Sequence, residues 1–158
     1  MMEFMRDAKM QDAKTIAEDA VRLIENHGYP LDAKPHYESY NFFLKLIEAD
    51  QFLCKYEKEL IAIVVWMFVD KNGLEDILLS HGSKWHLPKS YIVGSICYAD
   101  TIVIHEEYRT INFMRDFCKH VHDKIRLQRG KLFPVIGKFP LFMIRTDNTY
   151  RLKQEAMA

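Results

Sequence analysis

Titratable side chains gather where an apolar stretch of the chain ends. His105, Glu106 and Glu107 directly follow residues 96–104, and all three are of types that act as general bases. A solvated turn explains the same run at least as well, because turns expose charged side chains. Asp100 lies inside the apolar stretch, where a carboxylate needs hydrogen-bond partners and its pKa is open to perturbation. For Asp100 we retain both a catalytic role and a structural hydrogen bond.

A second group of metal-ligating residue types comprises Cys118, His120 and His122. On a helix only two of these three share a face, and no partner pair at ligand spacing occurs elsewhere in the sequence. Cys118 also falls on an apolar stripe, which favours core packing over metal ligation. We therefore expect no metal site.

A buried strand and an amphipathic helix are the elements expected to position these residues. In residues 96–104 both the even-numbered and the odd-numbered residues are mostly apolar. Alternate residues of a strand face opposite sides, so this pattern predicts a strand covered on both faces. Apolar residues then recur at helical spacing after the polar residues 105–109; they are Phe113, Met114, Phe117, Cys118, Val121 and Ile125. A short strand-to-helix connection directs backbone N–H groups and the positive end of the helix dipole at one place. Such a place suits an anion, commonly a phosphate.

Basic residues give the second half of this helix a charged side. They are Lys119, Lys124, Arg126, Arg129 and Lys131. A solvated face is the usual explanation, and attraction for an anionic ligand is the functional one. Both interpretations are kept.

Size and composition favour one folded domain spanning residues 1–158. The chain is 49% hydrophobic, and 22 basic residues balance 22 acidic ones, which argues against a general binder of nucleic acid or acidic membranes. Three widely separated cysteines indicate reduced thiols in the cytoplasm. The longest apolar run, residues 60–69, is about half of what spans a bilayer, so we expect a soluble protein.

The remaining segments predict a mixed α+β fold, with antiparallel strands first and a βαβ-like unit last. Expected helices begin at an Asp12 cap and end at Gly28, and begin again near Tyr37. Expected strands are 4–8, 52–56, 60–70 and 141–144, with a charged turn at 57–59 and a further turn at 70–73. Residues 74–94 are interpreted as an excursion over the mouth of the site. A terminal helix capped by Asp147 or Asn148 completes the order.

Three segments, in this order, resemble the GNAT superfamily of acyl-CoA-dependent N-acetyltransferases. MRDAKMQDAKTIAEDA is similar to the first strand and helix of that family, and ADTIVIHEEYR is similar to its fourth strand and the approach to its pyrophosphate loop. FMIRTDNTYRL is similar to its fifth strand and the asparagine that opens its fourth helix. The resemblance implies a GNAT-like central mixed sheet flanked by helices, with a shortened C-terminal part that lacks the final hairpin.

The resemblance also implies a site for acetyl-CoA. The thioester would lie against backbone N–H groups of Thr101–Ile104, and the pyrophosphate against the connection that follows. Implied cofactor-binding residues are Ile102, Val103, Ile104, Arg109, Thr110, Ile111, Asn112, Phe113, Met114, Arg115 and Asn148. Implied catalytic residues are Asp100, Glu107 and Tyr150, the last as a thiol-protonating acid in the terminal helix. The chain departs from the family pattern at Asn112 and Met114, where the family uses glycine and a small residue for close backbone approach.

Two functions are consistent with these features. The first is transfer of an acetyl group from acetyl-CoA to a primary amine of a small molecule or a protein. The second is a GNAT-like domain that no longer acylates and instead binds or regulates, such as a small phage or mobile-element protein. Trp85 and Tyr91 are expected to be exposed and to indicate a partner surface, for a second copy in a homodimer or for another protein. No nucleic-acid or membrane partner is expected.

Overall fold

The computed structural model describes residues 12–27, 36–79, 85–132, 142–146 and 149–153. Its elements are the helices α2 (Ala13–His27), α3 (His36–Glu48), α4 (Lys71–Leu79) and α5 (Ile111–Leu132), the 3₁₀ turn η1 (Glu106–Tyr108), and five strands. The strands are β1 (Phe52–Tyr56), β2 (Leu60–Val69), β3 (Ile96–Ile104), β4 (Phe142–Thr146) and β5 (Thr149–Lys153). The predicted mixed α+β class is confirmed.

The strands form one sheet in the order β1-β2-β3-β4-β5. β1, β2 and β3 are antiparallel neighbours, whereas β4 runs parallel to β3 and is reached through α5. β5 returns antiparallel to β4. The sheet is therefore an antiparallel meander followed by a βαβ unit and a final hairpin.

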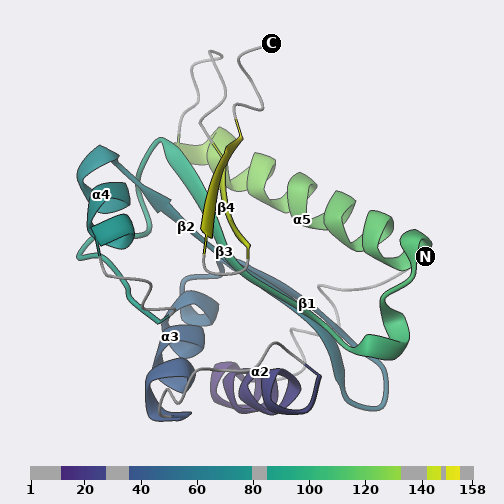
Figure 1. Ribbon diagram of the computed structural model, residues 1–158. Helices are drawn as coiled ribbons and strands as arrows, with labels where there is room; N and C mark the ends of the chain where they lie inside the picture. The colour runs from purple at the N-terminus through teal and green to yellow at the C-terminus, as the bar shows by residue number, and fades with distance from the viewer. Residues whose placement is uncertain (1–11, 28–35, 80–84, 133–141, 147–148, 154–158) are drawn as a thin grey trace.

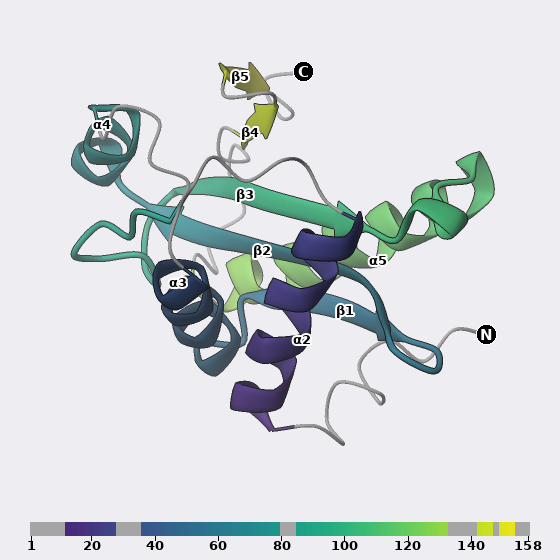
Figure 2. The ribbon, with the colours of Figure 1, turned by 60° about the horizontal axis from the view of Figure 1, so that its bottom comes forward.

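Helices cover both faces of the sheet, with α2 and α3 on one face and α5 on the other (Figures 1 and 2). Every residue of β2 is buried, as expected for a strand between two covered layers. Alternate side chains of β2 face opposite cores: Ile63, Val65 and Met67 join the α2/α3 core, and Val64 and Trp66 join the α5 core. The apolar run in the sequence thus reflects burial on two sides.

Local capping interactions explain where the first helices begin and end. Asp12 caps α2 as predicted, because its Oδ1 accepts a hydrogen bond of 2.7 Å from the Thr15 backbone N–H. That hydrogen bond lowers the pKa of the Asp12 carboxyl. After α3, Asp50 adopts the left-handed conformation with φ of 59°, and the N–H of Gln51 bonds to the Leu46 carbonyl at 2.9 Å. The chain then turns directly into β1.

Several expectations about residues 70–94 are wrong. Asp70 does not close a turn but caps α4, because its Oδ1 accepts a 2.7 Å hydrogen bond from the Gly73 backbone N–H. Trp85 is only 8% exposed and packs its ring against Phe42 and Phe43, so it offers no partner surface. Tyr91 is half-buried.

The C-terminal prediction also needs correction. Residues 149–153 form β5, not the start of a helix, so Tyr150 lies on a strand and pairs with Arg145 across a hairpin. The expected absence of a final hairpin is therefore wrong. The expected first strand at 4–8 and Asn148 lie outside the described residues.

Helix α5 extends to Leu132. Its buried stripe consists of Phe117 and Ile125, flanked by the partly buried Phe113 and Val121. Met114 and Cys118 were expected on that stripe but are exposed, because they lie one residue round the helix from Phe113 and Phe117. None of the helices in the described part of the chain is long and apolar enough to cross a membrane.

Candidate functional site

Strands β3 and β4 pair over only three residues of β3. The parallel ladder runs from Cys97↔Phe142 to Ala99↔Ile144, and within the described residues no strand pairs with β3 on this side beyond Ala99. β4 nonetheless continues for two more residues, which pair with β5. The two parallel strands therefore separate at their carboxyl ends, the place where open α/β sheets bind ligands.

A β-bulge lies at the same level of β3. Val65 pairs with Thr101 and Trp66 pairs with Ala99, so Asp100 is the extra residue between two β2 partners. Beyond the bulge Thr101 is half-buried and Ile102 is 38% exposed, unlike the buried residues 97–100. The expectation that β3 is covered on both faces is therefore wrong only at Thr101 and Ile102, because Val103 and Ile104 are buried again, one in each core. On the β4 side, residues 101–104 have a backbone edge with which no described strand pairs.

The start of α5 follows this edge. Thr110 caps the helix: its Oγ1 accepts a 3.2 Å hydrogen bond from Phe113 N, and its carbonyl accepts a 3.0 Å bond from Met114 N. The N–H groups of Ile111 and Asn112 have no carbonyl partner within the helix, as at every helix start, and lie at the positive end of the helix dipole. Ile111 is 75% and Met114 42% exposed, so neither side chain is packed into the core here.

Arg109 is anchored to the protein. Its Nε donates a 2.8 Å hydrogen bond to the Ile104 carbonyl, and its Nη2 donates to the carbonyl of His27 at the end of α2. The guanidinium thus ties the β3–α5 connection to α2. Arg115, one turn into α5, is exposed. Phe113 packs its ring against Tyr108 and Phe117, with centroid distances of 5.7 and 5.9 Å.

The three predicted catalytic residues occupy different places. Asp100 is 6% exposed at the bulge and accepts a 3.2 Å hydrogen bond from the Thr101 hydroxyl. Glu107 is exposed on η1, after the end of β3. Tyr150 lies on β5, at the far edge of the sheet from β1. Asp100 thus lies one residue beyond the last pair of β3 with β4, and no contact joins it to Glu107 among the described interactions.

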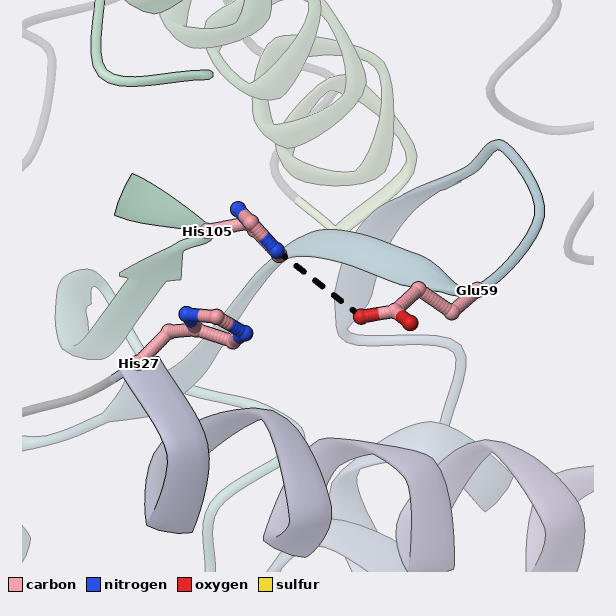
Figure 3. Close-up of side chains that lie close together, drawn as sticks. All are labelled: His27, Glu59 and His105. Atoms are coloured by element: carbon pink, nitrogen blue, oxygen red, sulfur yellow. Dashed lines mark ion pairs between the residues drawn. The ribbon is translucent and has the colours of Figure 1, made fainter. Parts of the chain in front are cut away.

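A cluster that the sequence did not predict lies at the other side of the β3–α5 connection. His27 is the last residue of α2, Glu59 precedes β2, and His105 follows β3. Figure 3 shows the two imidazoles beside each other and the Glu59 carboxylate directed toward His105. The ring centroids are 3.6 Å apart, and His105 Nε2 lies 3.9 Å from Glu59 Oε1. The only available sequence signal was that each residue sits at the end of an element.

Further contacts hold both imidazoles in place. His27 Nδ1 lies 3.3 Å from Glu106 Oε1, and His105 Nδ1 accepts a 3.1 Å hydrogen bond from the backbone N–H of Glu107. The histidine side chains are 18% and 12% exposed, respectively. His105, Glu106 and Glu107 are therefore not a purely solvated turn: the first is largely buried and the other two contact the two imidazoles.

The remaining sequence candidates have structural partners. His120 Nδ1 lies 2.8 Å from the Asp116 carbonyl one turn earlier in α5. Lys124, from the basic side of α5, bonds to Asp50 Oδ1 at 2.7 Å and to the Phe52 carbonyl at 2.6 Å. Burial lowers the pKa of Lys124, and Asp50 opposes that shift. This lysine fastens α5 to β1 and does not face an anionic ligand.

No protein-family model matches the chain, and no curated protein matches it significantly.

Proposed function

We propose that the chain binds an acyl-CoA along the unpaired edge of β3, beyond the end of its pairing with β4, and transfers the acyl group to a primary amine. The observation that carries the proposal is the end of β3–β4 pairing at Ala99↔Ile144, beside the bulge at Asp100. The separation leaves the backbone edge of residues 101–104 available beside the start of α5. An unpaired strand edge suits an extended, hydrogen-bonding chain such as pantetheine, with phosphates at the helix start.

The resemblance of the sequence to the GNAT superfamily agrees with this placement. In the proposed complex the thioester carbonyl accepts hydrogen bonds from backbone N–H groups of Ile102–Ile104, and the pyrophosphate lies against the first turn of α5. The amine nitrogen attacks the thioester carbonyl carbon and the carbon–sulfur bond breaks. The amine loses a proton and the departing thiolate gains one. Asp100 and Glu107 are the proposed bases, and Tyr150 is the proposed acid.

Turnover of acetyl-CoA with a panel of primary amines tests the proposal. We expect amine-dependent release of CoA thiol, measured with a chromogenic thiol reagent, and an upward shift of the melting temperature with acetyl-CoA alone. Absence of both effects at millimolar acetyl-CoA would remove the acyltransferase. The proposal also includes a cytoplasmic location, because the three cysteines form no disulfide and thiols stay reduced in the cytoplasm.

A second function, binding without acyl transfer, is favoured by one observation. Arg109 is the only basic residue of the connection itself, and its guanidinium already donates to the carbonyls of Ile104 and His27. An arginine that is already hydrogen-bonded to the protein contributes less to pyrophosphate binding, so the site would hold CoA more weakly. Stabilisation by acetyl-CoA without amine-dependent thiol release identifies this alternative, in which the chain is a binding or regulatory protein.

A further inference from the structure

We propose that His27, Glu59 and His105 form a binding site for one divalent transition-metal ion such as Zn²⁺. One ligand atom from each residue lies within 4.8 Å of the other two. Donors bound at about 2 Å to one tetrahedral ion lie about 3.3 Å apart. The three atoms, which lie within 4.8 Å of one another, must therefore approach each other by up to about 1.5 Å to share one ion. Two imidazoles and one carboxylate are a ligand set that such ions favour.

The surroundings of the cluster also favour a cation. Glu106 Oε1 lies 3.3 Å from His27 Nδ1, which fixes that ring and directs Nε2 to the ion, as carboxylates do beside metal-bound histidines. His27 ends α2, where the negative end of the helix dipole attracts positive charge. The positive charge of Arg109 opposes this attraction, but its guanidinium donates a hydrogen bond to the His27 carbonyl. Glu59 and Glu106 together carry two negative charges against the one positive charge of Arg109.

Binding requires two local changes at His105. Its Nδ1 accepts a hydrogen bond from Glu107 N, so in the neutral ring Nε2 carries the proton. When Nε2 ligates an ion, that proton moves to Nδ1 and the bond to Glu107 N is lost. The stacked rings, inclined by 32°, must also turn so that their lone pairs meet. The loss of one hydrogen bond is small beside the favourable free energy with which proteins bind structural zinc.

An ion held here would join three segments that are far apart in the sequence. It would link the end of α2, the β1–β2 turn and the β3–α5 connection (Figure 3). Three protein ligands leave one position for water or for a donor atom of a bound molecule. Glu59, 67% exposed, is the ligand with most freedom to close over the ion.

Titration of the untagged full chain with Co²⁺, followed by displacement with Zn²⁺, tests the site. Wild type should take up one equivalent of Co²⁺ with the visible absorption of a four-coordinate ion, and Zn²⁺ should raise the melting temperature. Glu59→Gln should weaken binding more than about 10-fold, and so should His27→Gln. Glu57→Gln, which removes the same charge from the same turn, is the matched control and should bind like wild type.

Two results would overturn the proposal. One is the absence of an equimolar ion in wild type at micromolar Zn²⁺. The other is equal affinity in Glu59→Gln and Glu57→Gln, because surface histidines would then account for the bound ion. Glu59 is exposed, so Glu59→Gln should fold and keep the comparison valid.

Discussion

The imidazole rings of His27 and His105 stack with their centroids 3.6 Å apart. This contact joins the end of α2 to the end of β3, and Arg109 reinforces it by donating to both the His27 and Ile104 carbonyls. The connection that leads into α5 is therefore held to the end of α2 by side chains. The proposed metal site includes His105 in this connection, and the proposed acyl-CoA site comprises the edge of β3 before it and the start of α5 after it.

Asn112→Asp tests the location of the phosphates. Aspartate in the first turn of α5 stabilises the helix start by about 0.5 kcal/mol, yet repels a phosphate bound there. We expect acetyl-CoA affinity to fall about 10-fold while thermal stability is unchanged or higher. Isothermal titration calorimetry measures the first quantity. Leu127→Asp adds the same charge at a residue 70% exposed near the other end of α5 and should leave affinity unchanged; equal losses in both variants would refute the placement.

Gly94 lies where no side chain fits. A Cβ atom there would stand 2.2 Å from the Val69 carbonyl carbon, which is backbone of the buried strand β2 and cannot move aside. Gly94→Ala should therefore lower the free energy of unfolding by about 3 kcal/mol in urea denaturation. At Gly73 the nearest atom to such a Cβ is Val69 Cβ, at 3.1 Å. Gly73→Ala should stay within about 1 kcal/mol of wild type, and a loss as large as that of Gly94→Ala would contradict the explanation.

Lys124 stabilises the contact between α5 and β1 through both its stem and its charge. Its Nζ lies 4.7 Å from the centre of the Phe52 ring, and its side chain is only 11% exposed. Lys124→Met keeps the packed stem and should cost about 1 kcal/mol, whereas Lys124→Ala should cost about 2 kcal/mol. Urea unfolding of both variants measures the difference. Identical losses would mean that the stem contributes nothing.

Tyr56 should make stability depend on pH in the alkaline range. Burial, followed by the 2.7 Å hydrogen bond to Asp19 Oδ2, raises the pKa of the Tyr56 phenol well above its ordinary value of 10.0. The folded protein keeps the phenol proton where the unfolded chain has lost it, so this stabilisation is complete below pH 10 and falls as pH rises further. Tyr56→Phe should be about 1.5 kcal/mol less stable than wild type near pH 8. The gap should narrow by about pH 11; a constant gap would count against the assigned cause.

Periodicity predicted the elements whose burial is simple. β2 is apolar throughout because both faces are covered, and α2 begins at Asp12 because a capping carboxylate precedes an apolar stripe. The prediction of a turn at residues 70–73 was wrong because aspartate, asparagine and glycine occur both in turns and at helix starts. In the folded protein Ile77 packs into the core, and this packing favours the helix α4 over a turn. At the C-terminus, Thr149–Leu152 have strand-forming character, but the helix-forming residues after 153 favoured the prediction of a helix.

The candidate site was only partly predictable for a topological reason. The strand-to-helix connection consists of consecutive residues, so the sequence pattern of residues 100–115 was enough to predict it. The bulge at Asp100 depends on the register with β2, which no periodicity specifies. His27 and Glu59 meet His105 only because α2, the β1–β2 turn and β3 end at the same corner of the sheet. No spacing within the sequence carries that information.

The measurement that tests the central claim most directly is an amide chemical-shift titration of the ¹⁵N-labelled chain with acetyl-CoA. We expect saturable shifts at the backbone amides of Thr101–Ile104 and of Ile111 and Asn112, which are the edge of β3 and the start of α5. Unchanged amides at millimolar acetyl-CoA, or saturable shifts confined to α2, α3 and α4, would contradict the central claim.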